Sequence, residues 1–334
     1  MATIYEVSKL AGVSLATVSR VMNKTANVSQ KTKLKVEKAM LDLGYKPNSV
    51  AISLASKRSD CVGILVTQLD GMFFGSMMNG IESELTKQRK HLVITAGHNV
   101  EHDERAGIDF LKSRNCDALI IHAEVLSDEY LIELSQGDTP IYILNRHIPE
   151  IAERCIHLDN QYGSYLATKH VIKAGHTEVL HISGPRYRKD AQERIIGFKQ
   201  AMYEAGLPVN ESHIFEGDYG HSGGAAAIDY FMQQRLSFTS IVCANDHLAV
   251  GAMARLRDFD KIPGEQIAIM GFDDMPFADC TYPKLTTIRY PIREMGKLAA
   301  DYVLKDVYKV QQKIPPSSFE PTLVIRDSVL NLSK

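Results

Sequence analysis

Three pairs of polar residues each follow a short apolar run in this sequence. They are Asn145 with Arg146, Asn245 with Asp246, and Asp273 with Asp274. Carboxylates and amides can each engage two neighbouring hydroxyl groups, and arginine donates a fixed fork of N–H groups. The set therefore suits a polyol better than a phosphate or an apolar ligand.

Aromatic residues could complete such a site. Phe73, Phe74 and Tyr219 could supply the flat apolar platform that a sugar ring needs. Each candidate also has a purely structural interpretation. An aspartate at a strand end can cap the next helix, which applies to Asp246 and Asp274, and Phe73 and Phe74 can be ordinary core residues.

The elements that must position these residues are strands. From residue 61 onward, short apolar runs alternate with longer helical patterns, which predicts parallel sheets with helices on both faces. The runs are CVGILV, HLVITAG, ALIIHA, PIYILN, EVLHIS, SIVCAND and IAIMGFDD. They suffice for two similar lobes, split near Asn160, with a cleft between them. Ligands of such sheets bind beyond the carboxyl ends of the strands, where the polar pairs fall.

Signals for catalysis are missing from the sequence. It contains no P-loop, GxGxxG, HExxH or GxSxG motif, and the Gly-rich stretch at 222–224 is followed by Ala. The five cysteines are odd in number and form no CxxC pair, so neither a disulfide framework nor a zinc site is expected. We predict a protein that is not an enzyme and has no cofactor and no metal.

The first 46 residues predict a small helical domain. Thr3 and Glu6 form a capping box, and the helix behind it stops at Gly12. Ser14 can cap a second helix that runs from Leu15 to about Met22, and this tight turn is typical of a helix-turn-helix. A third helix is expected between Ser29 and Gly44. Its expected inward stripe is Leu34, Val36, Ala39, Met40 and Leu43.

The charge distribution and the second helix both point to DNA. Residues 1–58 hold ten Lys and Arg against three Asp and Glu, whereas residues 59–334 hold 28 against 37. A basic segment on an acidic body is typical of phosphate binding, although a solvated basic face would look the same. The second helix would read base edges in the major groove, unless it is only a packed helical hairpin. Its outward residues are Leu15, Ala16, Thr17, Ser19 and Arg20.

The next segment would link this domain to the body. Pro47 breaks the third helix, and residues 49–58 could form only a short helix, below the roughly 12–15 residues that are stable alone. We expect this hinge to fold only with DNA and a second copy of the chain. Neither an apolar signal segment nor a run of roughly 18 apolar residues is present, so a cytoplasmic protein is expected. A transport-type sugar-binding protein would instead carry a signal peptide and no basic head.

Four motifs in the first 48 residues resemble the headpiece of the lactose/galactose repressor (LacI/GalR) family. They are TIYEV at 3–7, AGVS at 11–14, TVSRVMN at 17–23 and GYKPN at 44–48. The likeness covers nearly the whole chain, through LNR at 144–146, GHT at 175–177, AND at 244–246 and GFDD at 271–274. Within the family, LNR with RCIHLD at 154–159 and Tyr162-Gly163 is most similar to the galactose-repressor branch.

The resemblance implies an architecture and partners. It implies a helix-turn-helix headpiece at 1–46, a hinge helix and linker at 47–58, and a periplasmic-binding-protein-like effector domain at 59–334. The N-lobe would comprise about 59–160 and 290–321, and the C-lobe about 161–289 and 322–334. A homodimer would bind palindromic operator DNA as a repressor of sugar-utilisation genes and be released by a small galactose-like sugar. The alternative effectors are a different sugar, a nucleoside or a purine, and the sequence leaves open whether the effector is an inducer or a corepressor. The tail at 326–334 is too short for the heptads of a tetramer-forming coiled coil.

The resemblance also implies residue roles. Arg194, Asn245 and Asp273 fall on effector-contacting positions of the family, with Phe74, Asn145 and Tyr219 behind them. Phe73, Arg146 and Asp246 complete the predicted effector set. Leu54 would wedge into the minor groove at the operator centre. The remaining predicted DNA contacts, beyond the outward residues of the second helix, are Thr3, Tyr5, Ser14, Asn23, Ser29, Tyr45, Asn48 and Ala51.

Overall fold

The computed structural model describes residues 2–23, 28–45, 58–311 and 314–332. The chain divides into two compact units, Met1–Asp60 and Cys61–Lys334. The smaller unit is the headpiece and the larger one is the body. The predicted hinge at 47–58 lies almost wholly outside the described residues.

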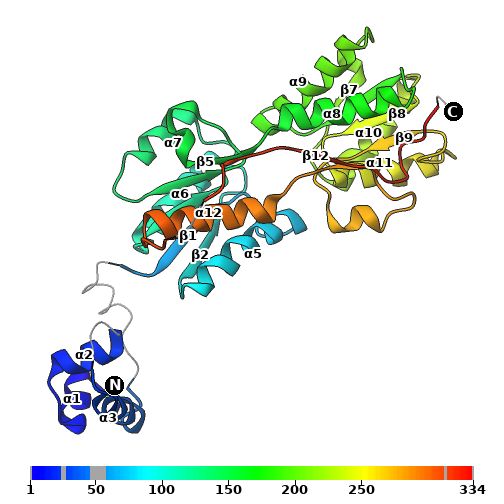
Figure 1. Ribbon diagram of the computed structural model, residues 1–334. Helices are drawn as coiled ribbons and strands as arrows, with labels where there is room; N and C mark the ends of the chain where they lie inside the picture. Colours follow the sequence, from blue (N-terminus) through cyan, green and yellow to red (C-terminus); the bar gives the residue numbers. More distant parts are fainter. Residues whose placement is uncertain (1, 24–27, 46–57, 312–313, 333–334) are drawn as a thin grey trace. The chain divides into compact units, whose positions relative to one another are not determined.

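Three helices form the headpiece (Figure 1): α1 (Ile4–Ala11), α2 (Leu15–Asn23) and α3 (Gln30–Asp42). The predicted capping box is present, because Thr3 N–H donates to Glu6 Oε2 at 2.7 Å and Glu6 N–H donates to the Thr3 hydroxyl at 3.4 Å. Gly12, at φ 65°, ends α1 in the left-handed region that suits glycine. Side-chain oxygens of Ser14 and Ser29 accept backbone N–H groups at the starts of α2 and α3. Local sequence signals therefore set all three helix starts.

The headpiece core is small and wholly apolar. Its buried residues are Val7, Ala11, Val18, Val21, Val36 and Ala39. Met40 and Leu43 are partly buried against this cluster, as their spacing in α3 predicts. The prediction was wrong for Leu34, which is 57% exposed. At about 100° per residue, Val36, Ala39, Met40 and Leu43 share one face of α3, whereas Leu34 lies on nearly the opposite side of the helix.

The body begins with a six-stranded parallel sheet in the order β11-β5-β4-β3-β1-β2. Its strands are β1 (Cys61–Val66), β2 (His91–Ala96), β3 (Ala118–Ile121), β4 (Ile141–Leu144), β5 (Cys155–Leu158) and β11 (Ser318–Phe319). Alternate strand residues contribute to two hydrophobic clusters, which shows that both faces are covered. One face carries α5 (Met72–Lys87) and α12 (Ile292–Asp306), and the other α6 (Glu101–Ser113) and α7 (Asp128–Ser135).

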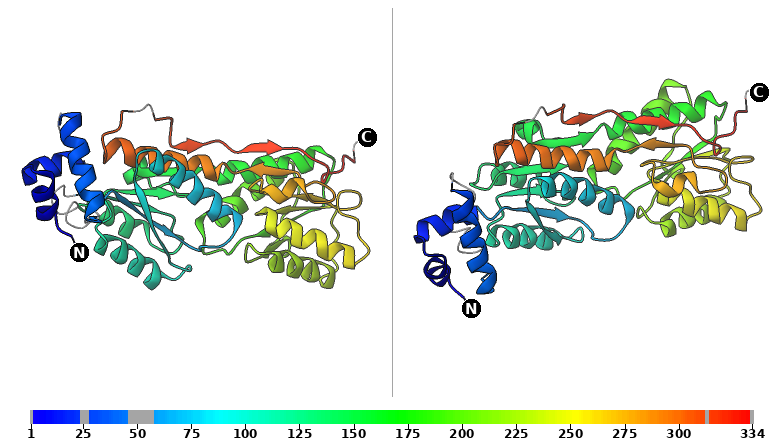
Figure 2. Two further views of the ribbon diagram at one scale, coloured as in Figure 1. Left: turned by 90° about the horizontal axis from the view of Figure 1, so that it is seen from below. Right: turned by 60° about the horizontal axis from the view of Figure 1, so that its bottom comes forward.

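A second sheet is parallel and has the order β7-β6-β8-β9. Its strands are β6 (Val179–Ser183), β7 (Ile214–Glu216), β8 (Ser240–Cys243) and β9 (Ala268–Met270). Helices α8 (Asn160–Lys173) and α9 (Lys189–Glu204) cover one face, and α10 (His221–Gln233) and α11 (Asp246–Asp258) cover the other. Single turns at Pro149–Arg154, Glu211–His213 and Pro276–Asp279 complete the body. Each sheet with its helices forms one lobe (Figure 2).

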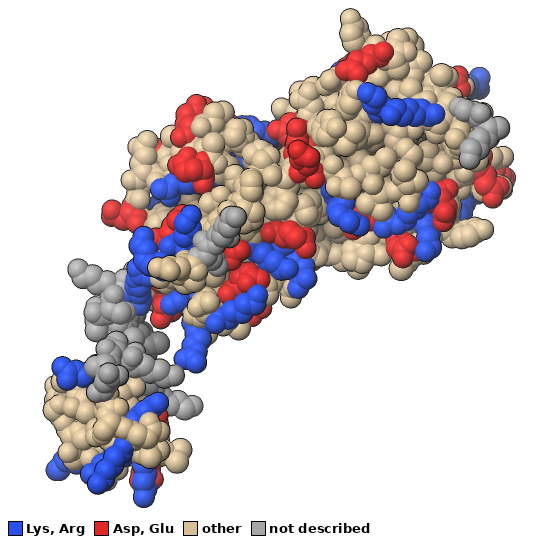
Figure 3. All heavy atoms as spheres, viewed as in Figure 1, with Lys and Arg blue, Asp and Glu red and all other residues tan. Residues whose placement is uncertain are grey.

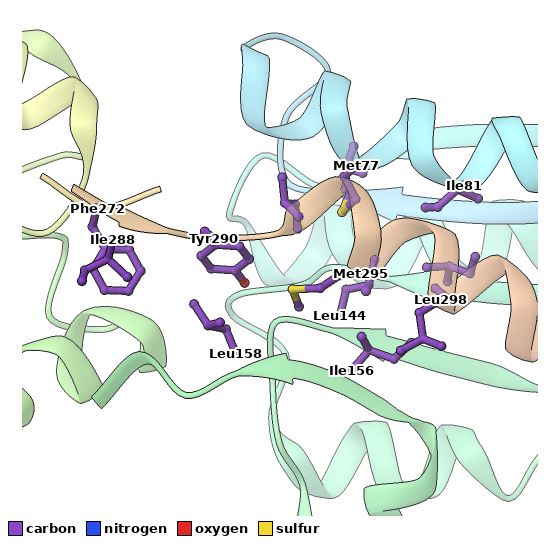
Figure 4. Packing of buried hydrophobic residues seen from close by; sticks show 14 of the residues in the cluster. Met77, Ile81, Leu144, Ile156, Leu158, Phe272, Ile288, Tyr290, Met295 and Leu298 are labelled. Atoms are coloured by element: carbon purple, nitrogen blue, oxygen red, sulfur yellow. The ribbon is translucent and has the colours of Figure 1, made fainter. Parts of the chain in front are cut away.

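The chain passes between the two lobes three times: from β5 to α8, from β10 (Thr287–Arg289) to α12, and from β11 to β12 (Thr322–Val324). Strands β10 and β12 pair antiparallel at the second lobe. One hydrophobic cluster extends through these crossings, with Phe272, Ile288 and Tyr290 on the second-lobe side and Met295 and Leu298 on α12 (Figure 4). The lobes thus share a continuous core beside the crossing segments.

All seven apolar runs named in the sequence form strands, namely β1, β2, β3, β4, β6, β8 and β9. The two-lobed fold with parallel sheets is therefore confirmed. The strands that the pattern did not predict are β5, β7, β10, β11 and β12, and none of these exceeds four residues. Predicted strands such as β9 are equally short but lie in runs of four or more apolar residues, whereas none of the missed strands lies in such a run.

Candidate functional site

A cavity of about 440 Å³ lies between the two lobes of the body. Its wall is built from the carboxyl ends of parallel strands in both sheets, the position at which α/β folds bind ligands. Thr67 and Gln68 follow β1, Arg188 lies between β6 and α9, and Asp218 follows β7. Six of the nine predicted effector residues line this cavity: Phe73, Phe74, Arg194, Tyr219, Asn245 and Asp273.

Arg194 is fixed by hydrogen bonds and is 3% exposed. Its Nε and Nη2 donate to Asn160 Oδ1 at 3.1 and 2.9 Å, and its Nη1 donates to the carbonyl of Ala244. The guanidinium lies over the ring of Phe272 at 3.8 Å from its centroid. Because its orientation is already set, the group can offer a ligand a donor without first losing rotational freedom.

Asp273 lies beside Arg194, with Oδ1 at 3.8 Å from Arg194 Nη1. Its backbone has φ 112°, a strained conformation for a residue with a side chain, and hydrogen bonds to Ile288 and Tyr290 hold it there. Burial raises the pKa of the Asp273 carboxyl to about 7, against the opposing effect of Arg194. The site therefore contains a carboxyl group that titrates near neutral pH.

Asn245 and the aromatic residues complete the predicted part of the wall. Asn245 Oδ1 accepts from Leu248 N–H at 2.8 Å, and Nδ2 donates to the Tyr219 carbonyl at 3.0 Å, so the amide joins two loops. Phe73 and Phe74 meet edge to face, with centroids 5.4 Å apart. Both pack against the core and also line the cavity, so the core interpretation and the platform interpretation both apply.

Three predicted effector residues do not line the cavity, because each makes internal contacts instead. Asn145 accepts a hydrogen bond from the Tyr290 hydroxyl, at the crossing from β10 to α12. Arg146 donates to the Leu126 carbonyl at 2.7 Å and pairs with Asp128 at 2.6 Å. Asp246 is fully buried and accepts hydrogen bonds from Met275 N–H and the Thr287 hydroxyl at 2.7 and 2.6 Å.

Neither Asp246 nor Asp274 caps the helix that follows it, which was the structural alternative for these two residues. Asn245, not Asp246, provides the side-chain cap of α11. Asp274 forms ion pairs with Arg289 at 2.9 Å and Arg326 at 2.7 Å. Asp246 therefore holds β10, and Asp274 holds both β10 and the C-terminal segment.

An ion-pair network between the lobes was missed by the sequence reasoning. Arg188, from the second lobe, pairs through Nη2 with Glu124 of the first lobe at 2.7 Å and with Asp190 at 2.9 Å. Glu104 supports this contact by accepting N–H groups from the loop at 124–126. Arg188 and Asp190 also line the cavity. Glu124 lies 64 residues from Arg188, so no local pattern could have connected them.

The headpiece presents the predicted DNA contacts on its surface. Thr3, Tyr5, Ser14, Ala16, Arg20 and Ser29 are exposed, and Leu15, Thr17, Ser19 and Tyr45 are half-buried. Val18 and Val21 of α2 face the core instead. On the face drawn in Figure 3, the charged side chains of the headpiece are mainly Lys and Arg, whereas the body mixes both signs. Asn48, Ala51, Leu54 and the side chain of Asn23 lie outside the described residues.

Comparisons with known proteins address both units. Residues 3–48 match the family described as bacterial regulatory proteins, lacI family, and residues 168–329 match the periplasmic binding protein-like domain. The HTH-type transcriptional regulator GalR of Escherichia coli (strain K12) is 37% identical over 330 residues, covering 98% of this chain and 96% of that protein. The chain belongs to the lacI family.

Other relatives of this lacI-family protein agree. The HTH-type transcriptional repressor PurR of Vibrio parahaemolyticus is 34% identical over 336 residues and is covered completely. A crystal structure of the lac repressor dimer bound to operator and the anti-inducer ONPF is 27% identical, with a TM-score of 0.88 over 98% of this chain and 99% of that one. The chain is thus a DNA-binding transcriptional repressor of the lacI family and not an enzyme.

The site of this lacI-family regulator is equipped for binding. Its wall contains charged and amide groups whose orientation is fixed by hydrogen bonds within the protein. The same wall contains aromatic rings that can cover the apolar face of a ligand. Among the described residues, no group of three or more His, Cys, Asp or Glu side chains could hold a metal ion. No helix in the described part of the chain is long and apolar enough to cross a membrane.

Proposed function

We propose that this lacI-family repressor binds palindromic operator DNA as a dimer and is released from it by a small, galactose-like sugar. The observation that carries the proposal is the cavity, in which Arg194, Asn245 and Asp273 share one wall with Phe73, Phe74 and Tyr219. Fixed donors and acceptors suit hydroxyl groups, and aromatic rings suit the apolar face of a pyranose. The regulated genes would be those of sugar utilisation.

A purine is the second candidate effector. Relatives named PurR are 34% identical to this chain over its full length. The aromatic residues Phe73, Phe74 and Tyr219 could stack on a planar base as well as on a sugar. A purine would then act as a corepressor, with the opposite effect on DNA affinity.

Titration calorimetry of the full-length protein separates these candidates. D-Galactose, D-fucose, D-glucose and guanine are each titrated under the same conditions. The proposal predicts saturable heat with at least one sugar and strongest binding of D-galactose or D-fucose. Binding of guanine without binding of any sugar would reject the sugar effector.

The signal to DNA would pass through residues 47–58. Closing of the cleft on a sugar would change how two partner copies present this segment to the operator. Leu54→Ala should then weaken binding to the operator and leave binding to random DNA, which depends mainly on Lys–phosphate contacts, nearly unchanged. Equal loss for both DNAs would make Leu54 a packing residue only. Light scattering should show a dimer, and a concentration-independent tetramer would contradict the assembly.

A further inference from the structure

Two histidines that belong to no predicted site line the cavity together. His221 is the first residue of α10 and His247 is the second residue of α11. Nδ1 of His247 and Nε2 of His221 lie 3.1 Å apart and share a hydrogen bond. The ring of Phe277 flanks both, with centroids 4.8 Å from His247 and 6.4 Å from His221.

The two rings are mounted on closely packed helices. A Cβ added at Gly251 of α11 would overlap the backbone carbonyl oxygen of His221, and one added at Gly224 of α10 would overlap that of Leu248. Any larger residue at either glycine would therefore separate α10 from α11. Because the helices meet backbone to backbone, the histidines keep a fixed spacing in the cavity wall.

The hydrogen bond between the rings restricts what they can offer a ligand. A neutral imidazole has one donor and one acceptor, and the shared bond uses the donor of one ring and the acceptor of the other. Whichever ring donates, the outer nitrogens, Nδ1 of His221 and Nε2 of His247, together present one donor and one acceptor. Neither ring makes another hydrogen bond within the described ranges.

The environment of His247 favours its uncharged form, and the one donor and one acceptor of the pair indicate the class of ligand. Burial, followed by the neighbouring His221, lowers the pKa of His247 below its ordinary value. The positive ends of α10 and α11 also disfavour a charged imidazole. An anion would require two donors, whereas two adjacent hydroxyl groups can accept from one nitrogen and donate to the other.

The pair is continuous with the rest of the wall. Arg194 donates to the carbonyl of Ala244, Asn245 follows, and His247 is two residues further along the chain. We propose that His221 and His247 form a specificity site that reads two adjacent hydroxyl groups of the sugar effector, beyond those that face Arg194 and Asp273. This inference rests on the proposed sugar effector and names the feature of the sugar that the regulator distinguishes.

Calorimetry on the full-length protein tests the site. The probes are the tightest-binding of D-galactose, D-fucose and D-glucose, and the monodeoxy analogues of that sugar. His221→Ala and His247→Ala should each weaken binding of the parent sugar about 3- to 10-fold, the usual effect of one neutral hydrogen bond. His147→Ala is the matched control, because His147 also packs against a second histidine, with its ring centroid 4.6 Å from that of His157, but does not line the cavity.

A double-mutant cycle distinguishes direct hydrogen bonds between the histidines and the sugar from a purely structural role of the histidines in the cavity wall. The deoxy analogue that lacks the hydroxyl read by His247 should bind the wild type more weakly than the parent sugar does, but should bind His247→Ala with the same affinity as the parent. His247→Gln, whose amide keeps a donor and an acceptor, should recover part of the affinity. This variant also keeps the test valid if the alanine variants fold poorly.

The failures can be told apart. No binding of any sugar to the wild type contradicts both the proposed function and the inference. Sugar binding that both alanine variants retain at wild-type affinity overturns the inference alone. If the variants weaken every analogue by the same factor as the parent sugar, the pair supports the wall without reading hydroxyls, and the inference is also wrong.

Discussion

The headpiece and the body treat charged side chains in opposite ways. The described headpiece has a core of aliphatic residues only, and its described Lys and Arg side chains are exposed or partly exposed. The body buries Glu104, Asp190, Arg194, Asp246 and Asp273 to below a tenth exposed. Burying charge is costly unless it is paired or hydrogen-bonded, which each of these groups is.

The difference follows from the ligands. DNA is a large polyanion that offers its phosphates to any exposed cation, so the headpiece needs only a rigid support for surface groups. A small polyol must be taken out of water, so its partners have to be oriented in advance inside the protein. If the two units are built on separate principles, single substitutions should impair one function and spare the other.

The largest difference between the effect on DNA binding and the effect on sugar binding should come from a substitution in the headpiece core. Val18 is fully buried, so Val18→Asn places an unpaired amide among the five other buried aliphatic side chains of the headpiece core and should unfold the headpiece. DNA affinity, measured by fluorescence anisotropy, should fall by at least about 100-fold, while calorimetry shows unchanged sugar binding. Leu34→Asn is the control, because Leu34 is 57% exposed and should tolerate the change. If Val18→Asn bound DNA with wild-type affinity, the headpiece core would not be what supports DNA binding.

Asp273→Asn should have the opposite effect, impairing sugar binding and sparing DNA binding. Removing a charged acceptor from the cavity should weaken sugar binding about 10- to 150-fold and leave DNA affinity without sugar unchanged. Asp274→Asn offers a control next to it in the chain, because that carboxylate pairs with Arg289 and Arg326 and does not line the cavity. If Asp274→Asn weakens sugar binding as much as Asp273→Asn, the effect is structural.

Sugar affinity should also depend on pH through Asp273. Burial raises the pKa of this carboxyl to about 7, so the carboxylate that accepts from sugar hydroxyls is protonated below that pH. Affinity should be nearly constant above about pH 8, about half of that value at pH 7 and roughly tenfold lower at pH 6, because the ionised fraction of the carboxyl falls in this range. Calorimetry at pH 6, 7 and 8 measures this, and Asp273→Asn should remove the dependence. A flat profile for the wild type would show that Asp273 is ionised throughout or does not contact the sugar.

The smallest effect should come from the capping box. Thr3→Ala removes an acceptor for Glu6 N–H and should cost α1 about 1 kcal/mol. Amide exchange of Ile4–Ala11 in the full-length chain should accelerate roughly fivefold, while the body stays protected as before. Glu6→Ala disrupts the same capping box. The double variant should therefore destabilise α1 by less than the sum of the two single effects. Unchanged exchange in both single variants would show that the box adds nothing.

The success of the sequence-based predictions also differs between the headpiece and the body. The headpiece depends on local signals, because a capping pair is three residues apart and a turn glycine acts on its own helix. Spacing therefore predicted α1, α2 and the start of α3. The failure at Leu34 came from including a residue that the helical period does not place on the buried face, because position 34 lies on nearly the opposite side of α3 from positions 36, 39, 40 and 43.

The body site depends on contacts between distant residues. The sequence placed Asn245 and Asp273 at the ends of apolar runs, and both line the cavity, because strand ends can be recognised locally. It could not show that Arg146 and Asp246 are used up by internal partners. Nor could it bring His221 to His247, 26 residues away, or Arg188 to Glu124.

The central claim is that a sugar in the body controls the affinity of the headpiece for DNA. Anisotropy with a palindromic duplex, selected by the full-length protein from a randomised library, measures this directly with and without saturating D-galactose. The account predicts that the sugar weakens DNA binding about 5- to 150-fold and that DNA weakens sugar binding by the same factor. Asp273→Asn should remove the response at the same sugar concentration. Unchanged DNA affinity, or tighter binding with the sugar, would contradict the account.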